Sequence, residues 1–137
     1  MKINEFLKLK NVNTSGSVSR KFIDEMYSRY PQNPFNRNEF GIVYGEGEDQ
    51  QVAFFDLRPG MRGDNWVEIY FIHTVPHKVG VGTRAMKELQ SMAKTRGIKL
   101  SLMAWDKGAV SQYKLKQFYT KLGFKPIKPG ANSFTWE

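Results

Sequence analysis

Two glycines, Gly80 and Gly82, lie between a strongly apolar segment and an amphipathic one, a spacing that is typical of anion binding. The segment Trp66–Val75 (WVEIYFIHTV) predicts a central strand that is buried on both faces. Pro76–Gly82 predicts a loop, and the apolar stripe that follows Thr83 predicts a helix. Glycines let the backbone approach a phosphate, and the N–H groups at the start of the following helix point at it. The pattern therefore indicates a phosphate-bearing ligand.

The elements that must position this loop predict one α/β domain over residues 1–137. The strands that the pattern predicts span residues 2–12, Phe40–Tyr44, Gln51–Leu57, Trp66–Val75, Ile98–Trp105 and Ser133–Trp136. Helical spacing of apolar residues predicts helices over Val18–Tyr30, Thr83–Arg96 and Ser111–Leu122. The order β-α-β-β-β-α-β-α-β is that of an α/β domain with a mixed sheet.

The glycine segment also fits a dinucleotide-binding pattern. Residues 80–85 (GVGTRA) match G-x-G-x-x-G/A, and Asp106 follows the next strand. In the dinucleotide fold, however, the glycines begin at the strand end, whereas Pro76 and its neighbours separate Val75 from Gly80 here. The residues after Asp106 are also too few to complete a doubly wound sheet. These features disfavour a nicotinamide cofactor.

A second pattern covers more of the chain. His77–Gly82 resembles the R/Q-x-x-G-x-G/A loop of the GNAT superfamily of N-acetyltransferases, which binds the pyrophosphate of coenzyme A. Tyr119–Phe124 (YTKLGF) resembles the late Y-x-x-x-G-F signature of the same family, and the elements between the two motifs follow the family's order. The resemblance covers roughly residues 66–124. It implies a mixed, mostly antiparallel sheet flanked by helices, whose central strand is splayed to admit acetyl-CoA.

The resemblance also implies roles for individual residues. The backbones of Tyr70 and Ile72 would pair with the pantetheine arm, and the N–H of Tyr70 is the candidate oxyanion donor. The residues expected to contact coenzyme A are Tyr70, Ile72, His77, Lys78, Val79, Gly80, Val81, Gly82, Thr83, Gln112 and Tyr119. Three positions depart from residues that are common in the family, namely His77, Gln112 and Leu115. None of these departures removes a backbone donor.

Acyl transfer to an amine needs a group that accepts a proton and a group that donates one. Tyr119 is the candidate acid, because a phenol with a pKa of about 10 is protonated at neutral pH; the alternative is a core aromatic. Glu68 is the candidate base, because burial in an apolar strand would raise the pKa of its carboxyl group. The alternative for Glu68 is an ion-paired structural residue. His73 is the rival base, although its place on the strand favours a structural hydrogen bond.

The composition narrows the possible partners, the possible metal sites and the expected location of the protein. The chain carries 21 Lys and Arg against 13 Asp and Glu, and this net charge of +8 favours polyanionic partners. It has no cysteine, which excludes disulfides and thiolate metal sites, and no other metal site is indicated. No apolar run approaches the roughly 18 residues of a membrane span, and the first ten residues contain no signal-peptide stretch. We therefore expect a cytoplasmic protein without a membrane span.

Together these observations predict an acetyl-CoA-dependent N-acetyltransferase in which a primary amine attacks directly in a ternary complex. The acceptor is open between a small molecule, a protein and an amine linked to nucleic acid, such as aminoacyl-tRNA. In this fold the groove for the acceptor is expected along Tyr27, Tyr30, Phe35, the turn after Leu57, Trp66, Glu68 and Tyr70. The alternative function is a non-catalytic basic domain that binds nucleic acid or acyl-CoA, using the aromatic and basic residues 113–118 for stacking. The expected state is a monomer or a homodimer.

Overall fold

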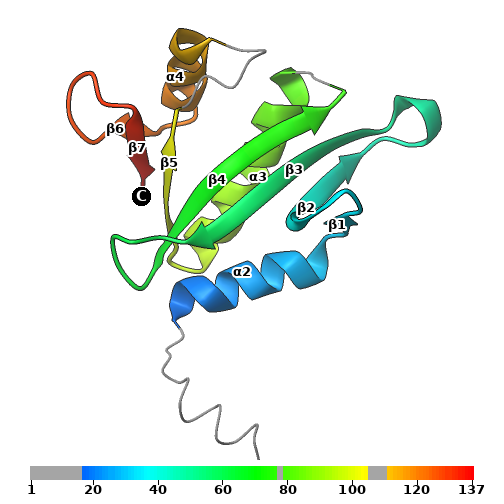
Figure 1. The fold of residues 1–137 in the computed structure, drawn as a ribbon, viewed down its shortest axis with the longest axis horizontal. Coiled ribbons are helices and arrows are strands. Elements are labelled where there is room, and N and C mark those ends of the chain that lie inside the picture. The colour runs from blue at the N-terminus through cyan, green and yellow to red at the C-terminus, as the bar shows by residue number, and fades with distance from the viewer. Residues whose placement is uncertain (1–16, 77–78, 105–110) are drawn as a thin grey trace, which may run out of the picture.

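The computed structural model of the chain describes residues 17–76, 79–104 and 111–137 (Figure 1). The predicted first strand, residues 2–12, lies outside this part of the chain. The elements in order are α2 (Val18–Arg29), β1 (Gln32–Asn33), β2 (Asn36–Tyr44), the short 3-10 helix η1 (Gly47–Asp49), β3 (Gln51–Pro59), β4 (Trp66–Val75), α3 (Val79–Thr95), β5 (Lys99–Met103), α4 (Gln112–Lys121), β6 (Lys125–Pro126) and β7 (Ser133–Trp136).

All the described strands form one sheet, in the order β1-β2-β3-β4-β5-β7-β6. Every neighbouring pair is antiparallel except β4 and β5, which are parallel. Parallel neighbours need a crossover, and α3 provides it. The expected mixed, mostly antiparallel sheet flanked by helices is thereby confirmed.

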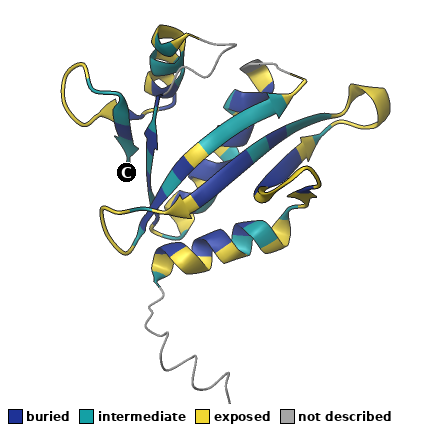
Figure 2. Cartoon of the chain, in the orientation of Figure 1, coloured by how far each residue is buried: buried dark blue, intermediate teal, exposed yellow. Residues whose placement is uncertain are grey.

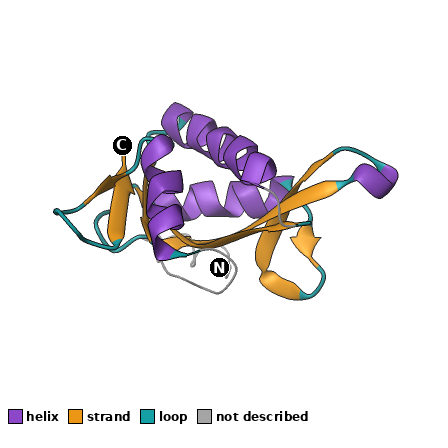
Figure 3. Cartoon of the chain, turned by 90° about the horizontal axis from the view of Figure 1, so that it is seen from above, coloured by secondary structure: helices purple, strands orange, loops and turns teal. Residues whose placement is uncertain are grey.

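The two long helices α2 and α3 lie on the same side of the sheet (Figure 3). Several polar contacts between side chains also join them. Arg96 donates from Nε to Oε1 of Glu25 at 2.6 Å, and the Tyr30 hydroxyl donates to Oε2 of Glu88 at 3.1 Å. None of the described helices is long and apolar enough to cross a membrane.

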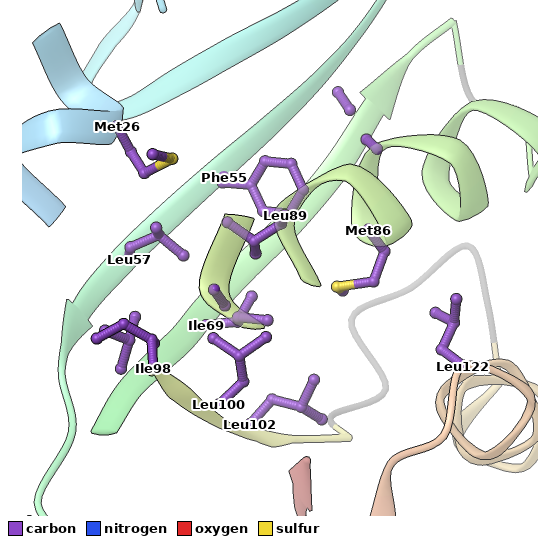
Figure 4. Close-up of a cluster of buried hydrophobic side chains, with 14 of the residues drawn as sticks. Met26, Phe55, Leu57, Ile69, Met86, Leu89, Ile98, Leu100, Leu102 and Leu122 are labelled. Atoms are coloured by element: carbon purple, nitrogen blue, oxygen red, sulfur yellow. The ribbon is translucent and has the colours of Figure 1, made fainter. Parts of the chain in front are cut away.

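The core fills the space between these helices and the sheet (Figure 4). The predicted stripe of α3 is confirmed, since Ala85, Met86, Leu89 and Ala93 have no solvent-accessible surface. Opposite them the sheet contributes apolar side chains from its central strands, namely Phe55, Leu57, Val67, Ile69, Leu100 and Leu102. Met26 joins the core from α2. Burial of these apolar surfaces is what holds the helical layer on the sheet.

The bounds of β4 agree with the prediction, but burial on both faces does not. Trp66, Val67 and Ile69 are buried, whereas Tyr70 is 48% exposed and the rest of the strand is half-buried or exposed (Figure 2). The reason is that β5 pairs with β4 only up to Ile69. The second half of the strand therefore lacks a neighbouring strand on that edge among the described residues.

The prediction of a loop over Pro76–Gly82 is also wrong for the second half of this segment. Helix α3 begins at Val79, four residues earlier than the apolar stripe indicated, so that Gly80 and Gly82 lie in its first turn. A glycine in a helix costs only about 1 kcal/mol relative to alanine. The apolar face of the rest of the helix outweighs this cost. Pro76, which cannot continue a helix, stays outside it.

We expect Leu89→Ala to lower the free energy of unfolding by about 2–5 kcal/mol, because the truncation leaves a cavity in a closely packed core. Urea denaturation followed by circular dichroism measures the change. Lys87→Ala, at an exposed position of the same helix, serves as the control and should change stability by less than about 0.5 kcal/mol. Equal losses in the two variants would contradict the packing of α3 on the sheet.

Candidate functional site

The candidate site begins where β4 and β5 separate. Their parallel pairing runs from Trp66 opposite Lys99 to Ile69 opposite Leu102 and then ends. Beyond that point β4 continues to Val75, and Figure 1 shows the two strands diverging towards the ends at which α3 and α4 begin. This divergence of β4 from β5 is the splay of the central strand that the sequence analysis predicts.

A β-bulge lies at the point of separation. Asp56 of β3 pairs with Phe71 and Leu57 pairs with Ile69, so that Tyr70 is the extra residue on β4. Bulges bend a strand and re-aim its side chains next to active sites. The guanidinium carbon of Arg58 lies 3.6 Å from the centroid of the Tyr70 ring.

Arg58 is in turn held by the buried carboxylate of Asp56. Its Nε and Nη2 atoms donate to Oδ1 and Oδ2 at 3.1 and 3.0 Å, and this pair of hydrogen bonds raises the pKa of the guanidinium. Two parallel hydrogen bonds fix the orientation of an arginine as well as its position. The ring of Tyr70 therefore rests against an oriented cation.

The start of α3 presents backbone donors at the wide end of the separation. The first N–H groups of a helix have no partner within it, and the helix dipole makes this end positive. The first turn contains no acidic residue that would compete for these donors. Among the described residues, a Cβ atom added to Gly80 would meet nothing within 4 Å, whereas one on Gly82 would lie 3.7 Å from Cζ of Phe118. The backbone around Gly80 is thus open to an approaching group.

The remaining residues predicted for this loop have different positions. The side chain of Val81 is buried in the core, so only its backbone can serve a ligand. Thr83 is half-buried in the next turn of the helix. His77 and Lys78 lie outside the described residues.

Helix α4 borders the same region from the other strand. Ser111 caps the helix by accepting a hydrogen bond from the N–H of Lys114. Gln112 donates from Nε2 to the carbonyl of Ala104 at 2.9 Å, which ties the start of α4 to the end of β5. Further along, Gln90 of α3 donates to the carbonyl of Leu122 at 2.8 Å. The start of α4 is therefore joined to β5, and its end is joined to α3.

Tyr119 lies on the buried face of α4 and is only 6% exposed. Its ring packs against Phe118, Phe124 and Phe134, with centroids 5.2, 5.9 and 6.3 Å away. Among the described residues, none hydrogen-bonds its hydroxyl group. Burial raises the pKa of this phenol to about 12. The hydroxyl is therefore a neutral donor at physiological pH, and a buried polar atom without a partner needs an explanation.

The two candidate bases have different surroundings. Glu68 is half-buried on β4, in register with Arg58 of β3 and Ser101 of β5, close to the bulge. His73 lies further along the strand, where its Nε2 is 2.9 Å from Oε1 of Glu39. This hydrogen bond agrees with the structural role that is expected for His73.

Glu39 is not predicted from the sequence pattern. It is 3% exposed and also accepts a hydrogen bond from Nδ2 of Asn33 at 2.8 Å. The predicted strand began at Phe40, one residue too late to include it.

The aromatic residues expected along the acceptor groove are not equally exposed. The hydroxyl groups of Tyr27 and Tyr30 make hydrogen bonds, to the carbonyl of Asn38 and to Glu88. Trp66 is buried, and Phe35 is 94% exposed on the β1–β2 turn. The described residues contain no group of histidine and carboxylate side chains that would hold a metal ion.

These features are those of an acetyltransferase fold, and comparison with known families agrees. The Acetyltransferase (GNAT) family profile matches residues 4–124. The chain belongs to this family, whose members transfer acyl groups.

Among solved structures, the crystal structure of the anti-CRISPR protein AcrVA5 is similar, with a TM-score of 0.51 and 16% sequence identity. The similarity covers 71% of this chain and 98% of that one, and it shows the fold. A comparison with curated proteins finds no match.

We expect the phenol of Tyr119 to ionise at a pH of about 12, above the ordinary value of about 10. Because the pKa is higher in the folded state, the unfolded chain loses this proton first, and folding stability falls as the pH rises from about 10 to about 12. Tyr119→Phe removes this contribution. Urea denaturation at a series of pH values should therefore show a shallower alkaline loss of stability in the variant, and parallel curves would contradict the burial of this phenol.

Proposed function

We propose that the protein transfers the acetyl group of acetyl-CoA to a primary amine, by direct attack in a ternary complex. One observation carries the proposal: the start of α3, which no described side chain covers at Gly80, and the hydroxyl of Tyr119, which no described residue hydrogen-bonds, belong to the two helices that begin at the wide end of the β4–β5 separation. The start of α3 suits a pyrophosphate, and the hydroxyl of Tyr119 suits a group that becomes negatively charged during the reaction.

The binding of coenzyme A is assigned to the start of α3 and to β4. The backbone N–H groups of Val79–Thr83 would bind the pyrophosphate, with His77 and Lys78 beside them. The backbones of Tyr70 and Ile72, beyond the last residue that pairs with β5, would align the pantetheine arm. Gln112 would border the same arm from α4. The open backbone at Gly80 supports this assignment, because a side chain there would occupy the approach.

Acetyl-CoA supplies an acyl group that is activated as a thioester. The N–H of Tyr70, at the bulge, would stabilise the negative charge that develops on the carbonyl oxygen. Tyr119 would donate its proton to the departing thiolate, a role that its neutral state permits. Glu68 would accept the proton of the attacking amine, directly or through water. Its place near the bulge supports this role.

The function predicts a specific effect of Tyr119→Phe. Removal of the hydroxyl should lower kcat for acetyl transfer by about 100-fold or more, because general acid catalysis contributes about 10²–10⁴-fold. Affinity for acetyl-CoA, measured by titration calorimetry, should change little, since the ring remains. Tyr113→Phe is the matched control, because this tyrosine lies on the same helix and is 70% exposed.

The two outcomes separate the interpretations. Full activity in Tyr119→Phe would contradict the assigned acid while leaving the family unchanged. Absence of acetyl-CoA binding in the unaltered protein would contradict the proposed function itself. Binding of acetyl-CoA should therefore be measured before candidate amines are screened.

Gly80→Ala tests the pyrophosphate site. A methyl group at this position meets no atom of a described residue within 4 Å, so the free energy of unfolding should stay the same or rise by up to about 1 kcal/mol. Affinity for coenzyme A should nevertheless fall, because the methyl group stands where the phosphate would approach. Thermal denaturation and titration calorimetry measure the two effects. Unchanged affinity with unchanged stability would mean that the start of α3 does not bind the cofactor.

A further inference from the structure

A cavity of about 350 Å³ lies between α2 and the ends of β2 and β3. In Figure 1 this is the region where α2 passes beside the end of β3. Its polar lining comes from α2 (Arg20, Asp24, Tyr27), from the start of β2 (Arg37) and from the end of β3 (Asp56, Arg58). The cavity is open to solvent, and its volume lies at the lower end of the range of about 300–1,000 Å³ that small-molecule sites have.

The cavity forms because β2 and β3 stop pairing. Their ladder ends at Phe40 opposite Phe55. Beyond it the hydroxyl of Tyr27 takes the place of a ladder hydrogen bond, since it accepts from the N–H of Leu57 at 3.0 Å and donates to the carbonyl of Asn38 at 2.6 Å. The two strands are thus held apart by a side chain of α2, and their backbone groups stay satisfied.

The cavity carries an excess of uncommitted positive charge. Of its three guanidinium groups, that of Arg58 forms an ion pair, with Asp56. Arg20 and Arg37 form none with any residue that the structure describes, and both are exposed. Guanidinium groups bind carboxylates and phosphates through paired, charge-assisted hydrogen bonds. Asp24 also lines the cavity and likewise forms no ion pair with a described residue, so the uncommitted groups are two guanidiniums and one carboxylate. The remaining excess of positive charge favours an anionic ligand group.

The cavity is connected to the bulge through the end of β3, because Asp56 and Leu57 line the cavity and pair on either side of the bulged residue. Arg58 lines the cavity and also lies over the ring of Tyr70, the bulged residue of β4. A ligand anchored at Arg20 and Arg37 would therefore extend past Arg58 towards the point where β4 and β5 separate. This is where the proposed function requires the acceptor amine.

We propose that this cavity binds a carboxylate or phosphate group of the acceptor, so that the substrate is a small amine with an anionic group. The inference rests on the proposed function. It agrees with the net charge of +8, which disfavours polycationic acceptors such as polyamines.

The test is a binding comparison between anionic amines and their uncharged counterparts. The probes are amino acids against their carboxamides, and phosphoethanolamine against ethanolamine. Each is titrated into the full-length protein by calorimetry, with and without coenzyme A. At least one anionic probe should bind about tenfold or more tightly than its counterpart, as expected for one charge-assisted interaction. The two arms distinguish a carboxylate from a phosphate.

Arg20→Gln and Arg37→Gln should each reduce this preference about tenfold. Lys21→Gln is the matched control, because it removes the same charge from an exposed position of α2 outside the cavity, and it should leave the preference unchanged.

Two results would overturn the inference: no anionic probe binds more tightly than its counterpart, or the preference survives in both arginine variants. A preference that is present without any binding of coenzyme A would instead overturn the proposed function and leave the anion site in place.

Discussion

The short pairing between β4 and β5 is the constraint on which the rest of the structure depends. Because the two strands are parallel, the chain must cross over through α3, and because they pair only up to Ile69, they separate before β4 ends. Where they pair, the sheet and α3 enclose a continuous apolar core. Where they separate, the sheet leaves an edge of β4 beside the starts of α3 and α4 (Figure 1). The early end of the β4–β5 pairing thus gives the sheet a closed end, where the core lies, and an open end, where the edge of β4 lies beside α3 and α4.

The two ends of the site rely on different groups. At the open end, binding is assigned mainly to backbone N–H groups, which any sequence with small residues at these positions can supply. Departures from the family's pattern at His77 and Gln112 therefore bear less on the fold than on affinity. The proposed chemistry, in contrast, depends on side chains. Burial keeps Tyr119 protonated, and the Asp56–Arg58 pair orients a cation against Tyr70.

The sequence predicted well those features that depend on local patterns. The bounds of β4 agree residue by residue, and those of α4 agree within one residue at each end, because apolar spacing and the capping Ser111 are local signals. The start of α3 was misplaced because glycines weaken the helical pattern without preventing the helix. The buried carboxylates of Glu39 and Asp56 could not be predicted, since their burial depends on the pairing of β2 with β3 and β4. The cavity beside Tyr27 depends on the same long-range contacts.

The most direct test of the account is a thermal-denaturation titration with acetyl-CoA, coenzyme A and NADH in parallel. A ligand that binds only the folded state raises the free energy of unfolding by RT ln(1 + [L]/Kd), about 2.7 kcal/mol at a hundredfold excess over Kd. The account predicts a concentration-dependent rise in Tm with both forms of coenzyme A and none with NADH. No rise with either form at low salt would contradict the assignment of the α3 start as a coenzyme A site.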